Sequence, residues 1–162
     1  RRSSDLFALQ FLGTRSGDLA DSGLSRNQEA SGMAAEPIRW IIEDALTFVK
    51  REVKRGNQYE AIMLDPPAFA KSQRTVEAAL DGYASLNRNA MALLPPGGLL
   101  CTASCSARVS AEEFFTAVKE ASFKARVDLQ LVHQRFQPPD HPTHIQFPQG
   151  RYLKFFVFRR MG

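Results

Sequence analysis

The sequence predicts an α/β fold with a mostly parallel sheet that ends in an antiparallel edge hairpin. Apolar segments of strand length alternate with segments of helical periodicity from Pro37 onward. Strands separated by helices of this length are joined by right-handed crossovers and lie parallel in one sheet. The last two apolar segments have no helix between them, so we expect them to pair antiparallel at an edge.

The composition is that of one ordinary soluble domain. The chain has 162 residues, of which 44% are hydrophobic and 23% are charged. It contains no apolar run of the roughly 18 residues that a membrane span requires, so we expect a cytoplasmic protein without a membrane partner. The net charge of +4 permits a polyanionic partner such as nucleic acid and does not demand one.

The N-terminal segment has the weakest pattern. Leu6–Leu12 is apolar without a clean period of 2 or 3.6, and a helical tendency is visible only around Leu24–Ser31, ended by Gly32. We therefore treat residues 1–32 as a divergent or truncated segment. Residues 33–162 form the main domain.

Within the main domain, periodicity and stop signals give an ordered series of elements. The expected strands are Ile38–Ile42, Tyr59–Leu64, Leu99–Ser104, Val127–Phe136 and Tyr152–Phe158. The expected helices follow Asp44, run from Val76 to Leu93 and open at Ser110. Their stop signals are Gly56 after the first helix and Pro95-Pro-Gly-Gly98 after the second.

Two local patterns refine these helices. In the first helix, Leu46, Val49 and Val53 share one face and are expected to point inward. Before the third, Ser110-Ala-Glu-Glu113 has the spacing of a capping box, in which the serine and the second glutamate satisfy each other's backbone amides.

Polar residues that carry chemistry follow the strands. Asp44, Asp65-Pro-Pro67 and Ser104-Cys-Ser106 each fall where a strand is expected to end, which is where α/β sheets bind ligands. Adjacent strands lie about 4.8 Å apart, so if the strands before Asp65 and Cys105 are neighbours, both side chains can touch one small planar group. This convergence is the main argument for a site.

Each of these residues also has a structural interpretation. Cys101 lies within its strand and reads as a small hydrophobe, whereas for Cys105, at the strand exit, structural and nucleophilic roles are equally open. Asp65 with its prolines makes either a rigid turn or a rigid holder for a flat polar base, with Phe69 available for stacking. Asp44 either caps the helix after it or accepts a hydrogen bond from an adenine amino group.

No metal site is expected. The three histidines, His133, His141 and His144, do not have the spacing of a ligand set, and the last two lie in a proline-broken loop.

Taken together, the motifs resemble those of class I S-adenosylmethionine-dependent methyltransferases, and most closely the bacterial 23S ribosomal RNA cytosine-5 methyltransferases. The resemblance covers about Asn27 to Arg160, and its strength is the order and spacing of several short motifs. They are Glu43-Asp-Ala45, Ile62-Met-Leu-Asp-Pro-Pro-Ala-Phe69, Lys71-Ser-Gln73, Pro96-Gly-Gly-Leu-Leu100, Ser104-Cys-Ser106, Asp140-His-Pro142 and Pro148-Gln-Gly-Arg-Tyr-Leu-Lys154.

The resemblance implies a Rossmann-like class I methyltransferase sheet, with residues 33–162 as the catalytic domain. It implies that Cys105 is the nucleophile toward carbon 6 of cytosine and that Asp65 holds the base. S-adenosylmethionine would be the cofactor and ribosomal RNA the substrate, with the target base flipped or unpaired. The implied cofactor-binding residues are Asp44, Ala45, Asp65 and Pro66. The implied substrate-binding residues are Pro67, Phe69, Ser104 and Ser106.

The chain departs from the family pattern in three places. The glycine-rich first strand and turn, and the acidic residue after the second strand, are not recognisable. Ala68 stands where relatives often have lysine, and their N-terminal RNA-binding domain is absent. Because a sheet without its central strands exposes unpaired backbone, we expect a fold that is incomplete at its N-terminus, with homo-oligomerisation as one remedy.

Two other functions stay open. The Asp-Pro-Pro-Ala-Phe motif is also used for methylating exocyclic amines, which requires no cysteine. A catalytically silent fragment that binds RNA or a partner through its basic surface is the alternative from another class.

Overall fold

The computed structural model describes residues 6–10, 43–70, 73–147 and 150–162. Its contacts divide the chain into two units, Arg1–Phe11 with Asp44–Gly162 and Leu12–Glu43, and the first is described below. The predicted strand Ile38–Ile42, the helical tendency around Leu24–Ser31 and the boundary after residue 32 lie outside the described residues. The elements are β1 (Leu6–Gln10), α2 (Ala45–Arg55), β2 (Ala61–Asp65), the 3₁₀ turn η2 (Gln73–Thr75), α3 (Val76–Met91), β3 (Leu99–Ser104), α4 (Ala111–Ala125), β4 (Leu129–Arg135) and β5 (Lys154–Arg160).

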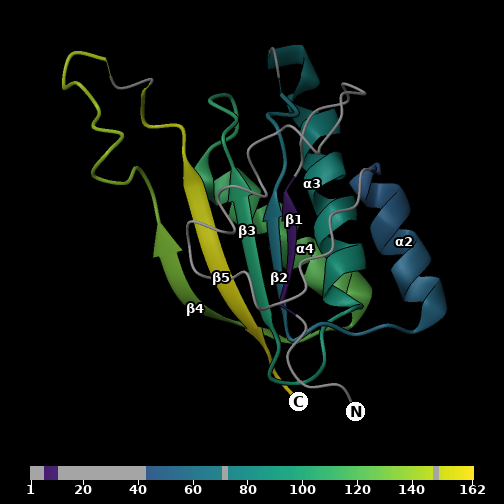
Figure 1. The fold of residues 1–162 in the computed structure, drawn as a ribbon. Helices are drawn as coiled ribbons and strands as arrows, with labels where there is room; N and C mark the ends of the chain where they lie inside the picture. Colours follow the sequence, from purple (N-terminus) through teal and green to yellow (C-terminus); the bar gives the residue numbers. More distant parts are fainter. Residues whose placement is uncertain (1–5, 11–42, 71–72, 148–149) are drawn as a thin grey trace, which may run out of the picture. The chain divides into compact units, whose positions relative to one another are not determined.

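The sheet has the order β1-β2-β3-β5-β4 in the described part of the chain (Figure 1). β2 lies between β1 and β3 and is parallel to both. β5 is antiparallel to β3 on one side and to β4 on the other. The α/β class and the antiparallel hairpin at the edge are thus confirmed. The carboxyl ends of β1, β2 and β3 share one edge, at which the N-terminus of α2 also lies (Figure 1).

β1 corrects the expectation that the sheet lacks a first strand. Leu6–Gln10 pairs with β2 along its whole length, from Leu6 opposite Ala61 to Gln10 opposite Asp65. Parallel strands commonly read as apolar runs without alternation, so a search for a period of 2 does not find this one. The backbone of β2 is therefore paired on both sides.

α2 is a capped amphipathic helix that ends where predicted. Gly56 adopts φ +70°, and its N–H donates to the carbonyl oxygens of Glu52 and Val53, so the left-handed residue closes the helix. The predicted inward face is confirmed in part: Val49 is fully buried and Leu46 packs partly buried against the core, and the rest of the buried face consists of Ala45, Phe48 and Glu52. Val53 is exposed, because burial of a glutamate rotates the inward stripe away from it.

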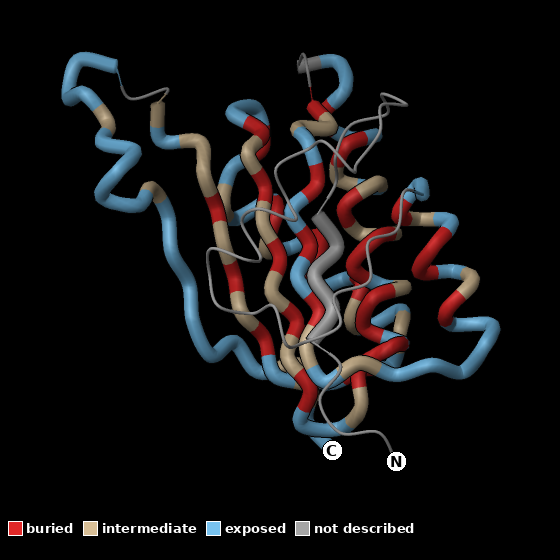
Figure 2. The backbone as a smooth tube through the Cα atoms, viewed as in Figure 1, coloured by how far each residue is buried: buried red, intermediate tan, exposed pale blue. Residues whose placement is uncertain are grey.

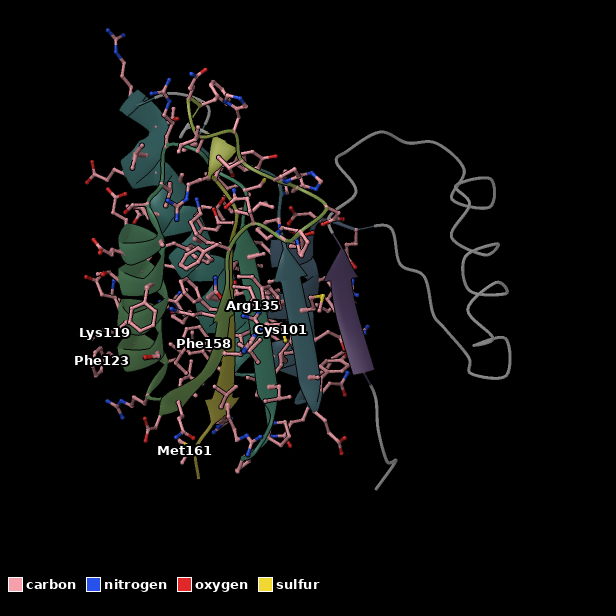
Figure 3. All side chains as sticks on the ribbon, turned by 90° about the vertical axis from the view of Figure 1, so that its left-hand side faces the viewer. Cys101, Lys119, Phe123, Arg135, Phe158 and Met161 are labelled. Carbon is pink, nitrogen blue, oxygen red and sulfur yellow. The ribbon has the colours of Figure 1, made fainter. Side chains whose placement is uncertain are left out.

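α3 and α4 cover one face of the sheet, as the edge-on view in Figure 3 shows for α4. Their inward residues and those of the strands form one core, red in Figure 2. The capping box is confirmed: Ser110 Oγ accepts from Glu113 N at 3.1 Å, and Ser110 N donates to Glu113 Oε2 at 2.8 Å. No helix in the described ranges has the length and apolar character needed to cross a membrane.

The turn into β3 depends on a glycine. Gly98 N donates to Pro95 O, and Gly98 O accepts from Arg160 N of β5. A Cβ on Gly98 would lie 2.9 Å from Pro95 O, closer than real Cβ atoms come, and 3.2 Å from Glu60 O, which is tighter than most such contacts. The predicted Pro-Pro-Gly-Gly stop thus also seats β3 between β2 and β5.

Candidate active site

Cys105 and Asp65 lie at the same edge of the sheet, on adjacent strands. β2 and β3 are parallel neighbours, with Met63 opposite Cys101 and Leu64 opposite Thr102. Asp65 therefore comes level with Ala103, and Cys105 follows two residues later, about 7 Å further along the strand direction. One pyrimidine ring could therefore contact Asp65 with one edge and Cys105 with the opposite edge.

The two side chains also share a face. In β2 the buried residues alternate with exposed Met63 and Asp65, and in β3 fully buried Thr102 and Ser104 alternate with half-buried Cys101. Because side chains alternate along a strand, Cys105 continues the half-buried set. The predicted pairing of the two strands is confirmed, and it brings a thiol and a carboxylate to one partly open surface.

The two cysteines have different surroundings. Both are free thiols. Burial within the sheet raises the pKa of Cys101, which favours its neutral thiol, and Figure 3 labels this residue among the strands. Cys105 lies beyond the last residue of β3 and is half-buried. The structure therefore agrees with an inert Cys101 and leaves Cys105 as the accessible candidate.

Ser104 and Ser106 point away from this surface. Both are fully buried, and Ser104 Oγ donates to the hydroxyl of Tyr83 at 3.0 Å. The Tyr83 hydroxyl lies 2.9 Å from Ser106 Oγ, and Ser106 N donates to Ser104 Oγ at 3.3 Å. The structure thus places the two serines in a buried network with α3, where they fix the backbone around Cys105, and not at a surface that a base could reach.

Lys154 contacts the turn after Cys105, and the sequence analysis did not single it out. Its Nζ donates to the carbonyl oxygens of Ser106 and Val109, both at 2.6 Å. A signal for it exists in the sequence: Lys154, Phe156 and Phe158 occupy alternate positions of β5 and are all buried. A lysine in the inward phase of a strand is unusual enough to single out.

The segment after Asp65 is rigid and partly packed. Asp65 and Pro67 are exposed, whereas Pro66 is buried. The ring of Phe69 lies 4.7 Å from that of Tyr83, with 37° between their planes, and also covers Gly82. One side of Phe69 is therefore occupied by α3, and stacking on a base stays a prediction for the rest of the ring.

Asp44 caps α2, as one of its two interpretations required. Its Oδ1 accepts from both Thr47 N and Thr47 Oγ1 at 2.9 Å. Both bonds use the same oxygen, so Oδ2 is left for another donor. Ala45, beside it, is buried in the core at 4% exposure. The available acceptors suit an adenosine. The exposed carboxylates of Asp44 and Asp65 can accept hydrogen bonds from its amino and hydroxyl groups.

Two cavities among the described residues lie away from this surface. The larger one, of about 430 Å³, is lined by Thr143, His144, Ile145 and Arg151 in the connection between β4 and β5. A smaller one, of about 60 Å³, lies between α4 and the strands β4 and β5. Over the described residues, no group of three or more His, Cys, Asp or Glu side chains is arranged to hold a metal ion.

Known proteins resemble this chain in sequence and in fold. No protein-family model matches it. Ribosomal RNA large subunit methyltransferase I of Klebsiella pneumoniae subsp. pneumoniae is 32% identical over 136 residues, which are 84% of this chain and 34% of the relative. The protein of the same name from Photobacterium profundum is 34% identical over 131 residues, 81% of this chain and 33% of the relative.

Among solved structures, SMU.776, described as a methyltransferase and complexed with SAH, has a TM-score of 0.70 at 20% identity. The match covers 88% of this chain and 37% of that one, and at this identity it shows the fold. The chain spans about a third of the length of the curated relatives it matches. Over most of its length the chain is thus related in sequence to ribosomal RNA large subunit methyltransferase I, and its fold is that of the SMU.776 methyltransferase structure.

Proposed function

We propose that this chain carries the catalytic part of a methyltransferase that modifies carbon 5 of a cytosine in ribosomal RNA. The observation that carries the proposal is the placement of Cys105, half-buried at the carboxyl end of β3, beside the strand that ends in Asp65. The names of the relatives support ribosomal RNA as the substrate class.

A thiol explains methylation of this carbon. Carbon 5 of cytosine is a poor nucleophile until a group adds to carbon 6. The sulfur of Cys105 forms the S–C6 bond, and the electron pair of the C5=C6 double bond shifts toward carbon 5. Asp65 holds the amino group or ring nitrogen of the base and favours the charge distribution of the adduct.

The methyl group comes from the cofactor: bound S-adenosylmethionine supplies it to carbon 5. Asp44, Ala45, Asp65 and Pro66 are the residues we assign to the cofactor, with the free Oδ2 of Asp44 as acceptor. A water molecule then takes the proton from carbon 5, the electron pair of that C–H bond restores the C5=C6 double bond, and the S–C6 bond breaks so that Cys105 leaves as a thiolate. Cys105 is thus both the attacking and the leaving group.

The competing enzyme chemistry, methylation of an exocyclic amine, uses the lone pair of the nitrogen and needs no sulfur. Replacing Cys105 therefore separates the two. Cys101→Ala is the matched control, because this thiol lies on the same strand face within the sheet.

We expect Cys105→Ala to reduce transfer of labelled methyl groups from S-adenosylmethionine to ribosomal RNA by more than about a thousandfold, and Cys101→Ala to leave it unchanged. Asp65→Asn should lower the rate by about a hundredfold or more. Nuclease digestion followed by mass spectrometry identifies the product. Full activity of Cys105→Ala, or a product methylated on a nitrogen, would contradict the proposal. Absence of methyl transfer together with absence of cofactor heat in calorimetry would favour the silent binding fragment.

A further inference from the structure

Lys154 places a charged side chain at a buried position against the turn that follows the candidate nucleophile. It is the first residue of β5, pairs with Ser104 of β3 in the antiparallel register and is 4% exposed. A buried ammonium loses its hydrogen bonds to water, so protein acceptors must replace them. Two of its three N–H groups donate to the carbonyl oxygens of Ser106 and Val109, at 2.6 Å each.

These two carbonyls bound the turn that carries the chain from β3 into α4. Val109 N closes the turn by donating to Ser106 O at 3.3 Å, the same oxygen that Lys154 binds. On its other side, Ser106 is held through its side chain by the Tyr83 hydroxyl. The residue after Cys105 is therefore anchored to β5 through its main chain and to α3 through its side chain, which fixes the direction of the Cys105 side chain.

The ammonium also acts on Cys105 through its charge. Burial lowers the pKa of Lys154 below its usual value, while negative charge on Cys105 and on Glu113 acts in the opposite direction. The geometry allows an electrostatic effect, since the ammonium is hydrogen-bonded to the main chain of the residue that follows Cys105. Glu113, on the first turn of α4, is the second group attracted to the same cation.

We propose that Lys154 is a positioning residue that fixes the Cys105 turn and supplies the positive charge that keeps Cys105 reactive as a thiolate. The thiol proton passes to solvent when the thiolate forms, and Lys154 keeps its own proton. The inference deepens the proposed function, on which its biological purpose rests, because that reaction uses a thiolate both to attack and to leave.

The test measures thiolate reactivity without any methyl transfer. In a Cys101→Ala background, the rate of iodoacetamide alkylation at Cys105 is followed by peptide mass spectrometry from pH 5 to pH 10. We expect Lys154→Met, which keeps the length of the side chain and removes its charge and donors, to slow alkylation at pH 7 about tenfold. Lys154→Arg, which stays charged, should retain most of the parental rate.

Two further variants keep the test decisive. Glu113→Gln preserves the capping box and removes the competing charge, so alkylation at pH 7 should become faster, by about twofold. This variant carries the test if Lys154→Met does not fold. Lys119→Met, at an exposed position of α4, is the matched control and should leave the profile unchanged.

A Lys154→Met profile that superimposes on the parent would overturn the inference. So would faster alkylation of Lys154→Met at every pH, which indicates only a loosened turn, or a Glu113→Gln profile that does not move. Dependence of alkylation on Lys154 in a chain that fails to methylate RNA would overturn the proposed function alone.

Discussion

At the scale of single residues, the hydroxyl of Tyr83 contributes most to the shape of the candidate site. The ring is fully buried and packs on Phe114 at a centroid distance of 5.0 Å. Its hydroxyl joins Ser104 and Ser106, 21 and 23 residues further along the chain. Both serines depend on it because none of the three side chains reaches solvent.

We expect Tyr83→Phe to lower the free energy of unfolding by about 1–2 kcal/mol, because it keeps the ring and leaves buried serine hydroxyls without their partner. Urea denaturation followed by circular dichroism measures this change. Tyr152→Phe is the control, since the Tyr152 hydroxyl makes no hydrogen bond to a described residue. Equal stability of the two variants would show that the network contributes nothing.

Long-range contacts of this kind are the part of the site that the sequence does not reveal. Cys105 and Asp65 could be placed because each follows a strand, and the carboxyl ends of parallel strands meet at one edge. The roles of Tyr83 and Lys154 could not be predicted, because each depends on a partner that is distant in the sequence and is brought near only by the fold. Lys154 and Ser106, for example, are 48 residues apart. The sequence analysis assigned Ser104 and Ser106 to the substrate because the sequence does not show which face of β3 is buried. In the structure both serines lie on the buried face.

At the scale of elements, Glu52 joins α2 to the start of β2. It is 4% exposed and accepts from Asn57 Nδ2 at 2.6 Å, Tyr59 Oη at 2.8 Å and Arg55 Nη1 at 3.1 Å. Burial alone raises the pKa of this carboxyl, but the hydrogen bonds from Asn57, Tyr59 and Arg51, with the charge of Arg55, outweigh it and lower the pKa below its usual value.

The direction of this shift predicts a pH dependence. A carboxyl whose pKa is lower in the folded state stabilises the fold above its unfolded pKa, and this contribution is lost as the pH falls through the folded value. Glu52→Gln should therefore be less stable than the parent by about 1–3 kcal/mol at pH 7, with a difference that shrinks below about pH 4.5.

Urea denaturation of both proteins from pH 7 to pH 3 measures this difference. Glu120→Gln, at an exposed position of α4, is the control and should match the parent throughout. A Glu52→Gln difference that stays constant over the whole range would mean that the packing of the side chain matters and its charge does not.

The elements themselves were predictable to different degrees. α2, α3 and α4 follow from helical spacing and from local caps at Asp44, Gly56 and Ser110. β1 did not, because its short run of four apolar residues followed by Gln10 shows neither a strand nor a helix period. The inward face of α2 was misassigned in part because a paired, buried Glu52 cannot be told from a solvated one in the sequence.

At the scale of the whole molecule, the described unit has two carboxylates and one thiol along the same edge of its sheet. Asp44 starts α2, Asp65 ends β2 and Cys105 follows β3, so three separate elements deliver them. This arrangement is expected for an enzyme that holds a base and a methyl donor side by side. The central claim is that Cys105 forms a covalent bond with the base.

Trapping that bond tests the claim most directly. In RNA that contains 5-fluorocytidine, fluorine replaces the proton that must leave carbon 5, so the adduct cannot resolve once the methyl group has been transferred. Incubating the chain with S-adenosylmethionine and this RNA should give a denaturation-resistant complex. Intact mass spectrometry should find the mass of chain plus RNA plus one methyl group, and digestion should locate the link at Cys105. Methylation of unmodified RNA without any trapped complex, or a complex that still forms in Cys105→Ala, would contradict the account.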